Sequence, residues 1–131
     1  MVKLSSIKLD LSDTAEVEYA EGIKVSLRRM PNPDFDAFMS KLRKPQLHRI
    51  RKGKMTDDET STLIKSAMAH TVVTGWTGLE DDDGSEIKFS SDKCFEFFKD
   101  PELYDFYQFC RTEAADVDNF MRADENDAVG N

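Results

Sequence analysis

The stretch GWTGLEDDDGSEIKFS, residues 75–90, decides how the rest of the chain is interpreted. It places Trp76, the only tryptophan of the sequence, between two glycines at positions 75 and 78. Four consecutive acidic residues and Gly84 follow, and a short alternating segment leads to Ser90. We expect the tryptophan ring to pack as a hinge between two helical layers, because its large apolar surface favours burial. We expect the acidic turn to stay in water, because adjacent carboxylates are costly to desolvate without partners.

Helix signals lie on both sides of this stretch. Thr56 and Glu59 have the spacing of a capping box. Ser90, and Asp100 followed by Pro101, are further helix starts. We therefore expect helices over about residues 56–75, 90–99 and 100–123. The apolar stripe of the last helix repeats with the helical period and consists of Leu103, Phe106, Tyr107, Cys110, Ala114, Val117 and Met121.

The N-terminal part predicts different elements. Alternating polar and apolar residues around Gly22 indicate a β-hairpin over about residues 14–30. Asn32 and Pro33 then start a helix over about residues 32–53. Pro45 interrupts this helix, so it either kinks there or continues as a second short helix.

These elements predict an α+β fold that is mostly helical. The N-terminal hairpin is followed by four to five helices packed as a small bundle. Residues 1–123 are expected to form a single domain, because 131 residues suit one hydrophobic core rather than two. Residues 124–131 are acidic and small, and we expect them to be a disordered tail.

The charge of the chain is unevenly distributed. The net charge is −8. Residues 1–75 hold 13 Lys and Arg against 10 Asp and Glu, whereas residues 76–131 hold 5 against 16. Such a chain can associate head to tail with copies of itself or present one charged face to a partner. The alternative is that both regions are simply solvated.

The sequence points to the cytoplasm. No apolar run approaches the roughly 20 residues of a membrane span, and the N-terminus does not resemble a signal peptide. Cys94 and Cys110 lie in apolar helical patterns, so we expect buried thiols in a reducing compartment rather than a disulfide.

No pattern for catalysis or metal binding is apparent. The acidic turn fails the spacing of a calcium loop, because its glycine sits at position 4 instead of 6. His48 and His70 have no ligand partners at metal-site spacing. Neither a nucleophile motif nor a phosphate-binding loop is present. We therefore expect a non-enzymatic protein without metal or cofactor.

The basic segment 41–54 is a candidate binding surface. It holds seven of the chain's 18 cationic residues. The candidate contacts are Lys41, Arg43, Lys44, Arg49, Arg51 and Lys52. Three interpretations stay open: phosphate binding in nucleic acid, docking on an acidic protein surface that includes another copy of the chain, and a solvated face. Nucleic acid is the less favoured binding partner, because no aromatic residue is interleaved to stack on bases.

Aromatic residues are dense in the C-terminal half. Their number exceeds what one helical stripe can bury, which favours a surface for protein binding. The candidate lining residues are Phe97, Tyr104, Phe109 and Phe120. The alternative is a thick helical core that buries all of them.

The order of these parts resembles the tail assembly chaperones of long-tailed bacteriophages and prophages. A hairpin ends in RRMPNP, residues 28–33, and a basic helix follows. A capped helix then runs into Gly75 and Trp76, an acidic Asp-Asp-Gly turn follows, and IKFS, residues 87–90, opens an aromatic helix pair. The resemblance covers about residues 14–122 and is densest over 73–90.

The resemblance implies a chaperone that keeps the tape-measure protein soluble and helps recruit tail-tube subunits in the cytoplasm of the bacterial host. Self-association is a further expectation, and membrane binding is not expected. Two alternatives belong to other classes. One is a nucleic-acid-binding regulator that uses segment 41–54, and the other is a structural tail-completion protein.

Overall fold

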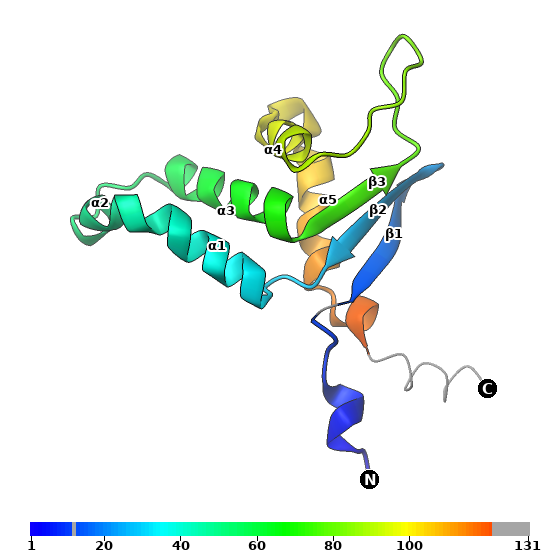
Figure 1. The fold of residues 1–131 in the computed structure, drawn as a ribbon, viewed down its shortest axis with the longest axis horizontal. Helices are drawn as coiled ribbons and strands as arrows, with labels where there is room; N and C mark the ends of the chain where they lie inside the picture. Colours follow the sequence, from blue (N-terminus) through cyan, green and yellow to red (C-terminus); the bar gives the residue numbers. More distant parts are fainter. Residues whose placement is uncertain (12, 122–131) are drawn as a thin grey trace.

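A three-stranded antiparallel sheet organises the molecule (Figure 1). The computed structural model describes residues 1–11 and 13–121; the predicted tail 124–131 lies outside this part. Strands β1 (Thr14–Ala20) and β2 (Ile23–Arg28) form the predicted hairpin, with Gly22 at positive φ in its turn. Val25 and Leu27 of β2 are completely buried, as the alternating pattern of this strand predicts.

The third strand corrects the prediction of a helix over 56–75. Helix α3 (Asp57–Thr71) ends earlier, and β3 (Val73–Thr77) pairs with β2, so that Val25 lies opposite Trp76. Val72, Val73 and Thr74 are β-branched, which favours extended backbone where a partner strand is available. Trp76 therefore lies on a strand and not at the end of a helix.

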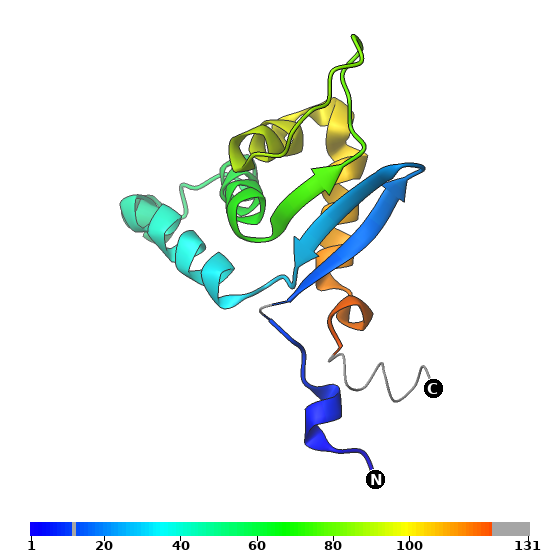
Figure 2. The same cartoon turned by 45° about the vertical axis from the view of Figure 1, so that its right-hand side comes forward.

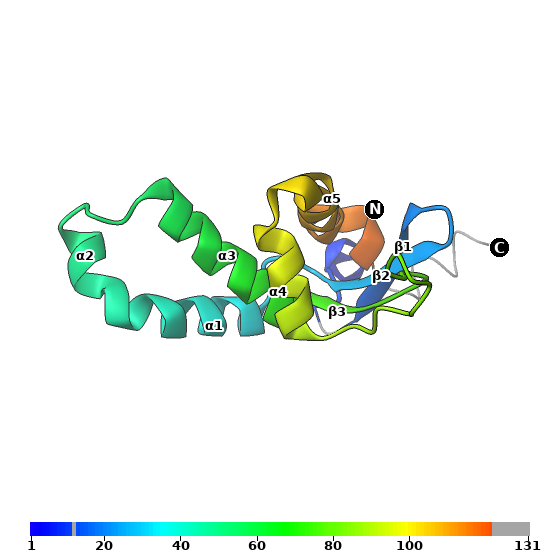
Figure 3. The ribbon, with the colours of Figure 1, turned by 90° about the horizontal axis from the view of Figure 1, so that it is seen from above.

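Helices α1 (Pro33–Arg43), α2 (Leu47–Arg51) and α3 form a helical arm that points away from the sheet (Figures 1 and 3). The 3₁₀ turn η2 (Lys44–Gln46) contains Pro45 and divides the predicted helix 32–53 into two. α1 and α3 pack against each other, and α2 lies at the end of the arm farthest from the sheet.

The side chain of Asn32 holds the base of this arm in place by hydrogen bonds. It is 2% exposed and makes three hydrogen bonds. Oδ1 accepts from the backbone N–H of Phe35, which caps α1 as predicted, while Nδ2 donates to the carbonyl oxygens of Arg29 and Thr71. One side chain thus joins the end of the hairpin, the start of α1 and the end of α3.

The C-terminal helices cover one face of the sheet, and α5 (orange) passes behind the strands in the view of Figure 2. Helix α4 (Ser91–Lys99) contacts β3 and α3, and α5 (Tyr104–Ala115) packs on β1 and β2. The 3₁₀ turn η3 (Pro101–Leu103) joins the two helices.

The predicted helix 100–123 is wrong in its length. α5 ends at Ala115, and η4 (Val117–Phe120) is a separate 3₁₀ turn. Asp116 has extended backbone, and its carboxylate accepts from the N–H of Asp118, so a local cap replaces the helical bond. Val117, predicted on the inner stripe, is consequently exposed.

The core joins the sheet to the helices. It is continuous from Val25 and Leu27 to Met68 of α3, Phe98 of α4 and Cys110 of α5. The predicted α+β, mostly helical fold is confirmed. Near the N-terminus, η1 (Leu4–Ile7) lies apart from this core, and Leu9 forms an isolated bridge with Met121.

Candidate functional site

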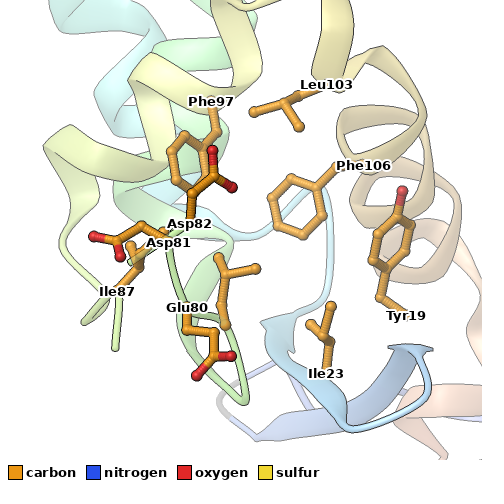
Figure 4. A pocket seen from close by; sticks show the side chains of 10 residues that line it. Tyr19, Ile23, Glu80, Asp81, Asp82, Ile87, Phe97, Leu103 and Phe106 are labelled. Carbon is orange, nitrogen blue, oxygen red and sulfur yellow. The ribbon is translucent and has the colours of Figure 1, made fainter. Parts of the chain in front are cut away.

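An apolar pocket with an acidic rim opens where the hairpin, the loop after β3 and the C-terminal helices meet (Figure 4). We call it the acid-rimmed pocket; its volume is about 350 Å³. It is lined by Tyr19, Ile23, Leu79, Glu80, Asp81, Asp82, Ile87, Phe97, Leu103 and Phe106. Carboxylates lie along one side of this view, with the rings of Phe106 and Tyr19 on the other.

The aromatic wall is built on Trp76. The ring of Phe97 stacks on that of Trp76, with centroids 5.3 Å apart and planes inclined by 10°. Phe106 meets both rings edge to face. Tyr19 extends the wall from β1, with its ring centroid 5.3 Å from that of Phe106. Such mutually packed rings hold the wall in one arrangement.

The rim is a small hairpin-like loop over residues 78–89. Its two sides are joined by the N–H of Ile87, which donates to the carbonyl of Leu79 at 2.8 Å. The Trp76 indole N–H donates to the carbonyl of Ile87 at 2.8 Å, so the loop is attached to the aromatic wall. This attachment places Glu80, Asp81 and Asp82 beside an apolar surface.

The turn of this loop holds its carboxylates in place. Asp81 Oδ1 accepts from the backbone N–H groups of Asp83 and Ser85. Hydrogen bonds with the Asp81 side chain and with Ser85 lower the pKa of Asp83 to about 2. Asp83 is therefore ionised at neutral pH and adds to the negative charge of the 78–89 loop.

The second candidate surface is the arm tip, defined here as residues 43–55. A hollow of about 420 Å³ lies there, lined by Arg43, Leu47, Ile50, Gly53, Met55, Thr60 and Leu63. Leu47 and Ile50 are 40% and 39% exposed. Most of the predicted basic contacts have exposed side chains in this part of the chain: Arg43, which also lines the hollow, Lys44, Arg51 and Lys52, together with Lys41 just before the tip.

Arg49 differs from the other cations of the arm tip. Its guanidinium binds the Glu59 carboxylate through both nitrogens, with Nη2 2.7 Å from Oε1. Glu59 also completes the predicted capping box with Thr56. Arg49 therefore fixes α2 to the start of α3 rather than offering a free charge.

This ion pair predicts a pH dependence of stability. The hydrogen bond from Arg49, and then that from the Thr56 backbone, lower the pKa of Glu59 from 4.5 to about 2. Between these values the unfolded chain binds more protons at this site, so the free energy of unfolding should fall as the pH decreases through this window.

Glu59→Gln should show a shallower decrease in the free energy of unfolding than wild type, measured by chemical denaturation at a series of pH values. Glu102→Gln, at an exposed carboxylate outside the pair, should follow wild type; parallel curves for Glu59→Gln would contradict the assignment.

The structure separates the four aromatic candidates. Phe97 lines the acid-rimmed pocket. Phe109 packs on the ring of Tyr19 and Tyr104 is 53% exposed, but neither lines this pocket. Phe120 is 2% exposed, so the prediction that it lines an open groove is wrong: it lies on the short turn η4, which packs against β1 and α5.

Several pocket residues were missing from the sequence-based candidates. Tyr19 and Ile23 come from the hairpin, and Leu79 and Ile87 from the two sides of the acidic turn. The alternation of the hairpin indicates one packed face, but it does not reveal that this face meets Phe106. The acidic turn was predicted only as a solvated loop, and its place beside the aromatic wall depends on the Trp76–Ile87 hydrogen bond.

The remaining chemistry of the described residues is limited. Cys94 and Cys110 are free and buried, as predicted, and burial raises the pKa of the Cys110 thiol to about 12. Among residues 1–11 and 13–121, no group of three or more His, Cys, Asp or Glu side chains is placed to hold a metal ion. No helix in the same part of the chain is long and apolar enough to cross a membrane.

A protein-family model described as YdaY prophage protein matches residues 30–131. The matched region begins after the β1–β2 hairpin and includes the helical arm, the loop over 78–89 and the helices that line the pocket. No curated protein and no solved structure shows significant similarity to the chain. Because the family model spans well over half of the sequence, the chain belongs to the YdaY prophage protein family.

Proposed function

We propose that this member of the YdaY prophage protein family is a non-enzymatic tail assembly chaperone. It binds the tape-measure protein, keeps it soluble and helps recruit tail-tube subunits in the cytoplasm of the bacterial host. The acid-rimmed pocket is the observation that carries the proposal.

The pocket matches the chemistry of an amphipathic helical client. Such a helix docks by inserting apolar side chains into a hydrophobic groove. Phe97, Leu103 and Phe106 supply apolar contacts, while Glu80 and Asp82 at the rim favour a client with Lys or Arg beside its apolar residues. The excess negative charge of the chain would keep a complex with an aggregation-prone client in solution.

Co-expression with the tape-measure protein of the same prophage tests this function. Wild type should bring the client into the soluble fraction and co-purify with it. Asp82→Lys should reduce the co-purified amount, because it reverses a charge at the rim. Asp118→Lys makes the same charge change in η4, outside the pocket, and should behave as wild type. A client that stays insoluble with wild type, or that is retained equally by both variants, would contradict the proposal.

A nucleic-acid-binding regulator is the second candidate function, supported by the exposed cations of the arm tip. Its affinity for DNA or RNA should decrease steeply with salt. The exposed side chains of Leu47 and Ile50 among these cations favour a protein partner, because phosphate binding has no use for them. The third candidate, a structural tail-completion protein, would be found in purified particles.

A further inference from the structure

The carboxylates of the acid-rimmed pocket have no cationic partner within the described part of the chain. The five ion pairs among the described residues involve other acidic residues: Glu16, Asp34, Glu59, Asp92 and Glu96. Glu80, Asp81 and Asp82 nevertheless lie beside the rings of Phe97 and Phe106. A ligand that satisfies both parts of the pocket must combine an apolar anchor with neighbouring positive charges.

The arm tip has this combination of groups. Leu47 and Ile50 lie three residues apart on α2, so they share one side of the helix. Both are partly exposed, and Lys44 and Arg51 flank them in the sequence. Among the described residues, neither of these two cations is part of an ion pair.

The two surfaces of one molecule cannot meet each other. α2 lies at the far end of the helical arm. The loop over 78–89 leaves β3 at the end of the strand that points away from the arm (Figures 1 and 3). α1 and α3 pack along each other, which keeps the arm extended. The complementary surface must therefore belong to another molecule.

We propose that the arm tip of one copy docks in the acid-rimmed pocket of a second copy. Leu47 and Ile50 enter the apolar part, and Lys44 and Arg51 face Glu80 and Asp82. The contact joins two different surfaces, so each copy keeps one free tip and one free pocket, and association continues into rings or open chains. This inference concerns the protein alone, so its failure would leave the proposed chaperone function standing.

Sedimentation velocity on the purified full-length protein tests the contact. The average mass of wild type should rise with concentration at low salt and fall when salt is added, because screening weakens the charge contacts. Lys44→Glu/Arg51→Glu and Glu80→Lys/Asp82→Lys should each weaken self-association by at least about tenfold, because like charges then face each other. Lys3→Glu/Lys8→Glu makes the same charge reversal as the arm-tip variant at exposed positions outside both surfaces, and it should associate like wild type.

Mixing the two charge-reversed variants makes the test specific. Each acidic tip then meets a basic pocket of the other variant. The equimolar mixture should recover the concentration-dependent mass of wild type, although each variant alone associates at least about tenfold more weakly. Circular dichroism of each variant verifies that it is folded. A wild type that is monomeric throughout the concentration series, an association that the reversals leave unchanged, or a mixture that stays monomeric would overturn the proposal.

Discussion

Replacing Gly78 by alanine should lower the free energy of unfolding by at least about 3 kcal/mol, the largest loss we expect from one added methyl group. Gly78 has φ +83°, a conformation that residues with a Cβ adopt at a cost. A Cβ there would also overlap the backbone carbonyl of Gly22 in the β1–β2 turn. The substitution therefore forces the hairpin tip and the start of the 78–89 loop apart. Urea denaturation gives the value directly.

Two other glycines provide matched controls for this prediction. Gly84 has φ +87°, but a Cβ added there would meet nothing within 4 Å, so Gly84→Ala should cost only about 1–2 kcal/mol of conformational strain. Gly75 lacks both features, and Gly75→Ala should change stability by no more than about 1 kcal/mol. Equal losses for Gly78→Ala and Gly84→Ala would contradict the close approach to Gly22. Because Ile23 and Leu79 line the acid-rimmed pocket, Gly78→Ala should also impair client binding.

Trp76→Ala should cost about 3–5 kcal/mol, because it removes a buried ring and leaves a cavity. Trp76 is 7% exposed, stacks on Phe97 and meets Phe89 and Phe106 edge to face. Trp76→Phe keeps an aromatic ring but removes the N–H that donates to Ile87, so it should cost about 1–3 kcal/mol. Since both variants lack the only tryptophan, unfolding has to be followed by circular dichroism.

Tyr104→Ala is the control for loss of an aromatic ring. Tyr104 is 53% exposed, its ring contacts that of Tyr107 and its hydroxyl accepts from the Gln108 side chain at the surface, so its removal should cost less than about 1 kcal/mol. A Trp76→Phe variant as stable as wild type would show that the bond to Ile87 does not hold the rim. A Tyr104→Ala loss comparable to that of Trp76→Ala would show that the exposed ring has a larger structural role.

Local signals predicted the element boundaries best. The capping side chains of Asn32 and Ser90, and the reciprocal Thr56–Glu59 box, all form the expected hydrogen bonds. Each depends on residues within three positions of each other, and their spacing is visible in the sequence. The alternation of β2 is local in the same sense, and the hairpin is where it was expected.

The errors arose where distant residues decide the structure. β3 was predicted as the end of a helix, because its partner β2 lies about fifty residues earlier and local propensity cannot reveal the pairing. The burial of Phe120 depends on the break at Asp116, which rotates the chain away from the helical stripe. The basic surface of the arm tip was predicted because its cations lie close together in the sequence. The acid-rimmed pocket was not predicted, because separate segments of the chain contribute to it.

The helical arm also has a consequence for the order of folding. β2 and β3 are separated by the whole arm, so direct pairing of Val25 with Trp76 would require closure of a long flexible loop. α1 and α3 need only the short connection through α2, and their contacts are closer in sequence. Once they pack, the hydrogen bond from Asn32 to Thr71 brings the ends of β2 and β3 together. We therefore expect the arm to form first and to bring the two strands together. Substitutions that loosen the packing of α1 on α3 should slow the formation of the β2–β3 hydrogen bonds, even where both strands are unchanged.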